Sequence, residues 1–355
     1  MHTLRLSVDT DHLTSASSAA AIKQAAEILR AGGTVAFPTE TVYGLGANAL
    51  DPAAVAKIFA AKQRPAWDPL IVHLADSSML PSITVRVPEK ALRLMNAFWP
   101  GPLTLLLPRN EAVPDAVTAG RPLVGVRVPA HPVAHALLQT AGLPIAAPSA
   151  NSFGRISPTM AQHVAEDLDG RIDAILDSGE TTHGLESTVV DPCPDTSYDS
   201  CIVYRPGVIT LEQIQALCPD AIAFKEAVPV DVEPQASPSP GVSLRHYAPK
   251  ARLLLIDGSG PDQMRRFVFE LQTAQRMGER PGIMLPDGFP PDDVMAGMLI
   301  YRWGEWGNED ELAHRLFAGL RWLDAAGATV ILCPLPATAG IGVAIRDRLR
   351  KAARR

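Results

Sequence analysis

The 355-residue chain is poor in cysteine. Its four cysteines, Cys193, Cys201, Cys218 and Cys333, show no C-x-x-C spacing. The absence of this spacing argues against a zinc knuckle and against a thioredoxin-type redox motif. We therefore expect reduced thiols in the core or on the surface.

Long apolar runs are also missing. No stretch reaches the eighteen or so apolar residues that a membrane-spanning helix needs. The first twenty residues carry acids and serines where a signal peptide would have a basic start and an apolar centre. The sequence thus predicts a cytoplasmic protein that does not enter a membrane.

Several catalytic signatures are absent as well. The chain has no Walker-type glycine-rich lysine loop, no complete dinucleotide fingerprint and no G-x-S-x-G elbow. No cysteine stands beside a histidine in a recognisable nucleophile pattern. We expect a site that works by orientation and charge neutralisation, as nucleotidyl and phosphoryl transfers commonly do.

Positive charge is scarce in the first part of the chain. Residues 1–215 hold 15 Lys and Arg against 21 Asp and Glu, so the whole net charge of −6 belongs to them. Binding nucleic acid by bulk electrostatics needs a basic footprint, so a few placed cations must hold any polyanion here. The basic run from Arg346 to Arg355 is expected to complement a helix dipole and to solubilise the C-terminus.

The length of the chain exceeds the usual limit for one core, which predicts two domains. Residues 1–224 alternate short helices and strands, the pattern of an α/β domain with a mixed, twisted sheet. Residues 225–250 lose this periodicity and accumulate prolines, which is typical of a stiff linker. Residues 251–355 predict a smaller, Rossmann-like parallel α/β domain.

Two local predictions concern the start of the first domain. Ser17 or Ser18 is expected to cap a helix that ends at Arg30. A buried strand from Thr34 to Phe37 then breaks at Pro38 into a loop that reaches Gly46. Ligands bind at the carboxyl ends of strands in open α/β sheets, so this loop is a candidate ligand contact.

Four cations stand in or beside loops of the first domain: Lys62, Arg64, Arg127 and Arg205. Each could pair with an acid on its own, because an isolated buried charge is too costly. Together they favour recognition of a polyphosphate and a carboxylate, which Arg binds bidentately and Lys as a point charge. The acids that could hold Mg²⁺ are Glu40, Glu186 and Asp191, and their pattern does not choose among them.

Ordered motifs carry a resemblance to a known family. They are Pro38-Thr-Glu-Thr-Val-Tyr-Gly-Leu45, Lys62-x-Arg64-Pro65, Pro69-Leu-Ile-Val-His73, Trp99-Pro-Gly-Pro-Leu-Thr104, Val126-Arg-Val-Pro129, Ala147-Pro-Ser-Ala-Asn151, Ser157-Pro-Thr159, Glu186-Ser-Thr188 and Arg205-Pro-Gly207. Over roughly residues 15–215 the chain resembles the YrdC-like family of L-threonylcarbamoyladenylate synthases. The segment Pro238–Pro249 and the domain after it resemble the longer, two-domain branch of that family.

The resemblance implies an ATP-dependent enzyme. Such an enzyme condenses L-threonine, bicarbonate and ATP to threonylcarbamoyl-AMP and releases pyrophosphate, with Mg²⁺ as the expected cofactor. The product serves a downstream tRNA threonylcarbamoyl transferase, which modifies the adenosine beside the anticodon of ANN-decoding tRNAs.

The resemblance also implies site residues. Those expected around threonine are Thr41, His73, Arg127, Ala147 through its backbone, and Ser187. Those expected around ATP are Lys62, Arg64, Asp68, Leu123 through its backbone, Ser149, Ser157, Arg205 and Tyr247, with Lys62 and Arg64 as the catalytic pair. Tyr247 would make the linker a lid that excludes water from a hydrolysable mixed anhydride. A carboxylate repels phosphates, so Asp68 is expected either to face a metal or to turn away.

Two alternatives stand beside the synthase. One is a double-stranded RNA or tRNA-binding module without adenylation activity, which the acidic balance of residues 1–215 disfavours. The other is the carbamoyl-transfer role of similar domains in hydrogenase maturation. Those proteins carry paired-cysteine zinc modules, and this sequence has none.

Overall fold

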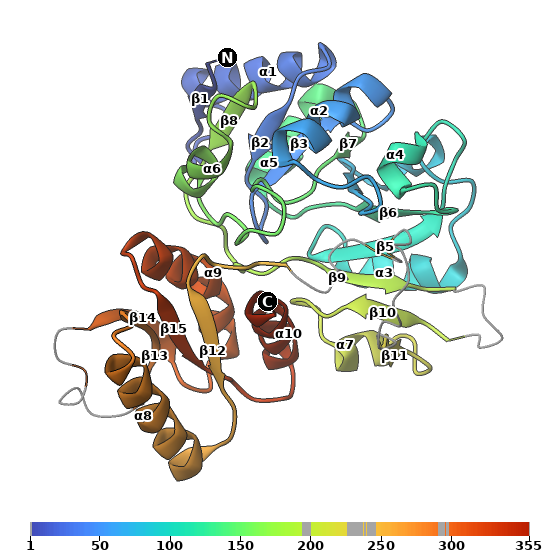
Figure 1. The fold of residues 1–355 in the computed structure, drawn as a ribbon. Helices are drawn as coiled ribbons and strands as arrows, with labels where there is room; N and C mark the ends of the chain where they lie inside the picture. Colours follow the sequence, from blue (N-terminus) through green and yellow to red (C-terminus); the bar gives the residue numbers. More distant parts are fainter. Residues whose placement is uncertain are drawn as a thin grey trace. The chain divides into compact units, whose positions relative to one another are not determined.

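The computed structural model describes residues 2–193, 200–225, 237, 239, 246–289, 295 and 298–354. The chain divides into two compact units. The first comprises Met1–Phe153, Ser157–Thr182 and Glu186–Ser243, and the second comprises Gly154–Ile156, His183–Leu185 and Leu244–Arg355 (Figure 1). Two three-residue segments that precede residue 186 therefore belong to the second unit.

The first unit is built on a mixed sheet with the strand order β1-β8-β2-β3-β7-β4-β6-β5-β9-β10-β11. The strands are β1 (Leu4–Ser7), β2 (Val35–Phe37), β3 (Gly44–Asn48), β4 (Ile71–His73), β5 (Leu103–Pro108), β6 (Leu123–Arg127), β7 (Ile145–Ala146), β8 (Ala174–Asp177), β9 (Thr188–Asp191), β10 (Ile202–Arg205) and β11 (Ile222–Ala223). The predicted mixed α/β sheet is confirmed. The edge strands β1 and β11 were not anticipated, because they are short and largely exposed.

Short helices connect these strands. They are α1 (Ala16–Arg30), α2 (Pro52–Lys62), the 3₁₀ helix η1 (Ser77–Ser82), α3 (Glu89–Phe98), α4 (Asp115–Thr118), α5 (Pro132–Ala141), α6 (Ala161–Leu168) and α7 (Leu211–Gln215). They agree with the alternation of short helices and strands predicted for residues 1–224.

Helix α1 begins earlier than predicted, because Ser15 is its cap. The Ser15 hydroxyl accepts a hydrogen bond from the Ser18 backbone N–H at 3.3 Å. The Ser18 side chain is buried and accepts from the Asp9 backbone N–H at 3.1 Å. Ser18 therefore contacts the preceding loop instead of capping the helix.

The loop after β2 is shorter than predicted, because the chain turns back at Gly44 to form β3. Strand β3 pairs antiparallel with both β2 and β7. A Cβ on Gly46 would lie 2.8 Å from atoms of both Phe37 and Ile145, so glycine allows the strands to approach. The candidate ligand loop is thus residues 38–43.

Strand direction places several site residues at one edge of the sheet. Strands β4 and β6 are parallel, with His73 opposite Arg127, the last residue of each strand. Strand β5 is antiparallel to β6 and parallel to β9, and β10 is antiparallel to β9. The start of β9 and the end of β10 therefore lie at the edge where β6 ends, which brings Ser187 and Arg205 toward Arg127.

The second unit has a four-stranded sheet, β12-β15-β13-β14, in which every described pairing is parallel. Its strands are β12 (Arg252–Ile256), β13 (Pro281–Asp287), β14 (Leu299–Glu305) and β15 (Val330–Pro334), and its helices are α8 (Gly260–Arg276), α9 (Glu309–Ala325) and α10 (Ile341–Ala353). Asn308 caps α9 by accepting a hydrogen bond from the Glu311 backbone N–H at 3.2 Å. The predicted parallel α/β domain is confirmed (Figure 1).

The basic run on α10 was expected to solubilise the C-terminus, but three of its cations do not lie on the surface. Arg346, Arg348 and Lys351 are buried. Arg346 pairs with Asp257 at 2.8 Å, and Arg348 and Lys351 both contact Asp347. These three cations are structural residues of the second unit, because each has an acidic partner within it.

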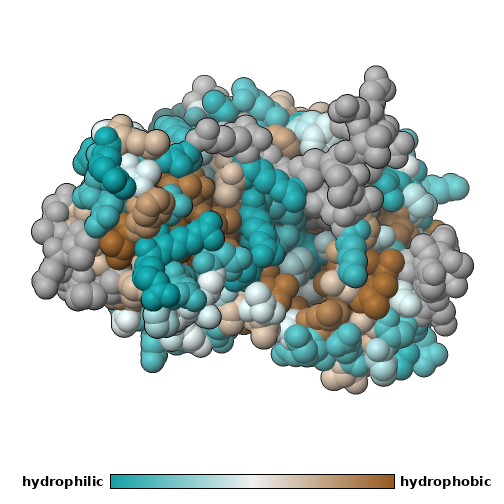
Figure 2. Space-filling model, turned by 60° about the horizontal axis from the view of Figure 1, so that its bottom comes forward, coloured by the Kyte–Doolittle hydropathy of each residue, from teal (hydrophilic) through white to brown (hydrophobic). Residues whose placement is uncertain are grey.

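Polar side chains cover much of the face drawn in Figure 2, and apolar residues gather there in separate patches. Among the residues that the structure describes, no helix is both long enough and apolar enough to cross a bilayer.

Candidate active site

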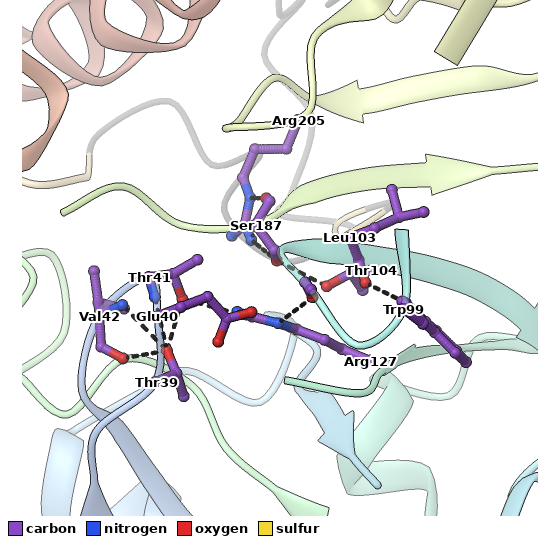
Figure 3. Close-up of polar contacts among 11 residues, drawn as sticks. Thr39, Glu40, Thr41, Val42, Trp99, Leu103, Thr104, Arg127, Ser187 and Arg205 are labelled. Carbon is purple, nitrogen blue, oxygen red and sulfur yellow. Dashed lines mark hydrogen bonds and ion pairs between the residues drawn. The ribbon is translucent and has the colours of Figure 1, made fainter. Parts of the chain in front are cut away.

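Arg127, at the end of β6, is the centre of one buried polar cluster. Its Nη1 donates to the Thr41 hydroxyl at 2.9 Å, its Nε donates to the Gly101 carbonyl at 3.2 Å, and its Nη2 lies 2.6 Å from a carboxylate oxygen of Glu40 (Figure 3). We call Glu40, Thr41, His73 and Arg127 the Arg127 cluster. All four are at most 5% exposed.

Glu40 is a buried carboxylate beside a buried guanidinium. Arg127 and Glu40 form a close ion pair, and neither Glu40 oxygen has a partner with full hydrogen-bond geometry among the described residues, although Arg127 and the backbone N–H of Ala130 lie close enough to lower the pKa of Glu40. Burial alone raises the pKa of Glu40, but the Arg127 charge outweighs it and holds that pKa below its ordinary value. Glu40 is therefore an anion with unused acceptor capacity.

His73 lies beside Arg127 on the neighbouring strand. Its ring meets that of Phe37 edge to face with centroids 6.0 Å apart, and its Nδ1 has no partner among the described residues. Burial, reinforced by the Arg127 charge, lowers the pKa of His73 to about 3. His73 is thus a neutral imidazole with a polar atom available to a ligand.

Thr39 fixes the loop that carries Glu40 and Thr41. Its hydroxyl oxygen accepts from the backbone N–H groups of Thr41 and Val42 and lies 2.8 Å from the Thr41 hydroxyl. It also donates to the Val42 carbonyl at 2.7 Å (Figure 3). These bonds set the direction in which Thr41 presents its oxygen to Arg127.

Ser187 and Arg205 form a second group at the same sheet edge. The Ser187 hydroxyl lies 2.8 Å from that of Thr104, and Arg205 Nη2 donates to the Ser187 hydroxyl at 3.0 Å (Figure 3). Arg205 also donates from Nε and Nη2 to the Ser187 carbonyl, at 3.0 and 2.9 Å. A Cβ on Gly207 would lie 2.4 Å from the Thr188 backbone nitrogen, so glycine is required for the packing of this loop.

Lys62, at the end of α2, organises the loop after β7. Its ammonium donates to the backbone carbonyls of Ser149 and Asn151 and lies 3.4 Å from the Asn151 side-chain oxygen. Lys62 is 1% exposed. Burial and the nearby Arg64 charge lower the pKa of Lys62 well below its ordinary value, although Asp68 and Asp167 oppose the shift. We call Lys62, Arg64, Asp68 and the Ser149–Asn151 segment the Lys62 cluster.

Asp68 faces Arg64. Its carboxylate lies 2.9 Å from Arg64 Nη2, and Arg64 also donates to the backbone carbonyls of Asp68 and Pro69, at 3.0 and 2.8 Å. The Asp68 side chain is fully buried. The structure thus gives the Asp68 carboxylate an internal cation as its neighbour.

The remaining predicted contacts are distributed around these clusters. The Ala147 backbone N–H donates to the Ile71 carbonyl at 2.8 Å, so only its carbonyl could serve a ligand. Ser157 donates to Glu186 at 2.5 Å, Ser149 is half-buried, and Leu123 begins β6. The roles predicted for these residues stay predictions.

Tyr247 lies in the second unit and is 1% exposed. Its ring stacks on that of Phe317 with centroids 5.4 Å apart, and the Arg348 guanidinium lies 5.3 Å from the ring centroid. Its φ of 64° is unusual for a residue with a side chain. Arg245, two residues before Tyr247, lies outside the described residues. The contact of Tyr247 with a nucleotide stays a prediction.

Among the described residues, no group of three or more His, Cys, Asp and Glu side chains could hold a metal ion. Two of the acids considered for Mg²⁺ have other neighbours: Glu40 pairs with Arg127, and Glu186 accepts from Ser157.

Sequence reasoning did not assign roles to Thr104 or Asn151, and it considered Glu40 only as a candidate Mg²⁺ ligand. The position of Glu40 between two threonines marked the loop as polar. The sequence did not indicate its partner, Arg127, because that residue is 87 positions away.

The chain is similar to proteins of one family. The family model described as "Telomere recombination" matches residues 27–207, and that described as "Threonylcarbamoyl-AMP synthase, C-terminal domain" matches residues 209–354. A threonylcarbamoyl-AMP synthase of Bacillus subtilis is 44% identical, over 99% of this chain and 98% of the relative. That of Pyrococcus abyssi is 42% identical, over 93% of both chains.

Solved structures agree with this similarity. The crystal structure of P. abyssi Sua5 complexed with L-threonine has a TM-score of 0.88 and 39% identity, covering 99% of this chain and 98% of that one. A P. abyssi Sua5 variant with adjacent histidine and tyrosine replaced by alanine has the same TM-score and 38% identity, covering 99% of this chain and 96% of that one.

Proposed function

Because the chain belongs to the threonylcarbamoyl-AMP synthase family and carries both of its domains, we propose that it condenses L-threonine, bicarbonate and ATP to threonylcarbamoyl-AMP and pyrophosphate. In this reaction the threonine nitrogen bonds to the carbon of bicarbonate, with loss of water and a proton. An oxygen of the resulting carbamate then bonds to the α-phosphorus of ATP, and pyrophosphate leaves.

Threonine binds at the Arg127 cluster. Arg127 binds the substrate carboxylate, since a guanidinium on a rigid strand end matches that group. Thr41 and Ser187 offer hydroxyls, His73 offers a neutral ring nitrogen, and Ala147 offers its carbonyl. The observation that carries the proposal is the position of Thr41 and His73 beside one buried guanidinium, together with the threonine complex of the similar P. abyssi protein.

ATP binds beside the Lys62 cluster. Lys62, Arg64 and Arg205 counter the phosphate charge, and the loops that carry Leu123, Ser149 and Ser157 supply neutral contacts. Charge neutralisation at the α-phosphate makes Lys62 and Arg64 the catalytic pair, because the transition state places more charge on the oxygens near the leaving group. To meet a phosphate, the Lys62 ammonium must exchange at least one backbone carbonyl for it.

Mg²⁺ enters with the triphosphate of ATP. The described residues offer no cluster that would hold the ion by themselves, whereas phosphate oxygens are common Mg²⁺ ligands. When bound, Mg²⁺ supplies further charge neutralisation to the phosphates. The product then passes to a tRNA threonylcarbamoyl transferase. Direct binding of tRNA by this chain has weak support, because residues 1–215 are acidic.

The linker covers the nucleotide, with Tyr247 as the contact. The linker residue Ser237 is buried and donates from its backbone N–H to the Trp67 carbonyl at 3.0 Å, next to Asp68. A solved variant of P. abyssi Sua5 replaces adjacent histidine and tyrosine residues, and this chain has adjacent His246 and Tyr247.

The lid proposal predicts a loss of ATP affinity in Tyr247→Ala. Stacking on a base is worth about 1–3 kcal/mol, so we expect KM for ATP to rise roughly 10- to 100-fold. Tyr247→Phe, which keeps the ring, should retain most of the activity. Unchanged steady-state kinetics in Tyr247→Ala would remove Tyr247 from the site.

The proposed activity is tested by incubating the purified chain with Mg²⁺-ATP, L-threonine and bicarbonate. Mass spectrometry should detect threonylcarbamoyl-AMP, and pyrophosphate release should require all three substrates. Tight tRNA binding with a steep salt dependence, in the absence of any turnover, would instead support an RNA-binding module.

A further inference from the structure

We propose that Glu40 binds the α-ammonium group of threonine, so that Glu40 and Arg127 together recognise the two opposite charges of a free amino acid. This inference rests on the proposed function and assigns Glu40 a substrate contact that the sequence did not suggest. It also predicts a specificity: ligands need both a free amine and a free carboxylate.

The first support is the unused acceptor capacity of Glu40. The side chain is 5% exposed, and neither carboxylate oxygen has a partner with full hydrogen-bond geometry among the described residues, although Arg127 and the Ala130 backbone N–H lie close to them. Buried polar atoms are costly to leave without a hydrogen bond, so native proteins usually complete them with protein groups, water or a ligand. An ammonium group brings three donors, which match these oxygens.

The second support is the position of Glu40. Its carboxylate lies 2.6 Å from Arg127 Nη2 without hydrogen-bond geometry, and the side chains of the two residues point toward one another in Figure 3. Thr41, which contacts the same guanidinium, follows Glu40 in the chain. A zwitterion placed against this pair would set its carboxylate on Arg127 and its ammonium on Glu40, so each member of the existing ion pair gains a second partner of opposite charge.

The third support is that Glu40 remains ionised. Arg127 holds the pKa of Glu40 below its ordinary value despite burial, while the neutral His73 brings no competing charge. Glu40 is thus the anionic side chain of this cluster.

The same ion pair has an opposite reading, in which Glu40 competes with the threonine carboxylate for Arg127. Both readings accept the observed contact, but they predict opposite effects of neutralising Glu40. The ammonium-binding role predicts weaker threonine binding, because an attractive charge is lost. Competition predicts tighter binding, because a repulsive charge is lost. The two empty acceptor oxygens favour the first reading.

The test compares wild type with Glu40→Gln, which keeps the size of the side chain and removes its charge. Three ligands are titrated calorimetrically: L-threonine, L-threonine methyl ester, and (R)-3-hydroxybutanoate, which is threonine without its amine. We expect Glu40→Gln to weaken threonine binding about 10- to 100-fold, the loss typical of a charge-assisted hydrogen bond. Binding of 3-hydroxybutanoate should stay the same or improve in the variant.

Kinetics give an independent readout. Glu40→Gln should raise KM for threonine while KM for ATP remains unchanged, a split that a general loss of folding would not produce. The matched control is Glu27→Gln, an exposed glutamate on α1 that pairs only loosely with Lys23 at 4.0 Å. Glu40→Asp, which keeps the charge, should recover part of the threonine affinity.

Unchanged or tighter threonine binding in folded Glu40→Gln overturns the proposal. If that variant does not fold, the affinities of the wild-type protein for the two ligands decide. Equal affinity for threonine and 3-hydroxybutanoate overturns the proposal. At least tenfold weaker binding of 3-hydroxybutanoate supports it. A wild-type chain that neither binds threonine nor forms threonylcarbamoyl-AMP would contradict the proposed function itself, so the two failures are distinguishable.

Discussion

The Arg127 cluster and the Lys62 cluster both bury cations, but they satisfy them differently. Arg127 faces a carboxylate whose oxygens still lack hydrogen-bond donors. In the Lys62 cluster, Lys62 donates to the carbonyls of Ser149 and Asn151, and Arg64 contacts Asp68 and two carbonyls. The first cluster therefore fits the proposed zwitterion without rearrangement, whereas the second would have to exchange internal contacts to hold the proposed phosphates.

Removing the guanidinium of the first cluster should have the largest effect. Arg127→Ala leaves Glu40 buried without its cation and removes the carboxylate contact. Truncating one partner of a buried charge pair costs about 2–5 kcal/mol, so kcat/KM for threonine should fall at least roughly 30-fold and by as much as several thousand-fold. Initial rates at varied threonine measure this loss. Arg127→Lys should recover little, since Lys lacks the planar fork.

Replacing the central cation of the second cluster should have the next largest effect. Lys62→Met keeps the apolar stem and removes the ammonium, so both the phosphate contact and the contacts to the Ser149–Asn151 loop are lost. With charged hydrogen bonds worth about 1.5–3 kcal/mol, kcat/KM for ATP should drop roughly 10- to 100-fold or more. Threonine affinity measured without ATP should change far less. Equal losses for both ligands would break the division into two clusters.

The neutral His73 predicts an acid-sensitive Arg127 cluster. Its pKa is about 6.5 in an unfolded chain and about 3 in the fold. Between these values the unfolded chain binds a proton that the folded chain does not, so the free energy of unfolding falls as the pH decreases below about 6.5. The His73 contribution is at most about 1.4 kcal/mol per pH unit.

Urea unfolding of wild type and His73→Asn between pH 6.5 and 5 checks this expectation. The variant should show a shallower loss of stability, because asparagine does not titrate. Glu40 does not interfere in this range, since its pKa is held below the ordinary value of 4.5. Parallel curves for the two proteins would mean that His73 protonates in the fold as easily as in the unfolded chain.

Neutralising Asp68 should have the smallest effect on catalysis. Asp68→Asn keeps a side-chain oxygen beside Arg64 and removes a negative charge from the phosphate side. We expect KM for ATP to stay the same or decrease by less than about tenfold, since less than 1.4 kcal/mol is involved. A large increase in KM would show that Asp68 positions Arg64 through its charge. KM for threonine serves as the internal control.

Most of the strand positions were predictable because buried strands are continuous apolar runs. Leu103–Pro108 and Val330–Pro334 are examples, because both are largely apolar runs in the sequence. Strand β3 was missed because Gly44-Leu-Gly46 has no strand-like composition. Glycine stands at position 46 because the neighbouring strands leave no space there for a side chain. Ser15 was missed as a cap because Ser17 and Ser18 are equally good caps by residue type.

The sequence by itself determined the fold class, the two-domain form and the family, because these depend on local periodicity and on motifs that are contiguous in the chain. Only the tertiary structure decided which charges meet. Glu40 reaches Arg127 because a loop after β2 closes onto the end of β6, and Lys62 reaches Ser149 and Asn151 across the chain. Such pairings depend on strand order and register, and no local pattern of residues records them.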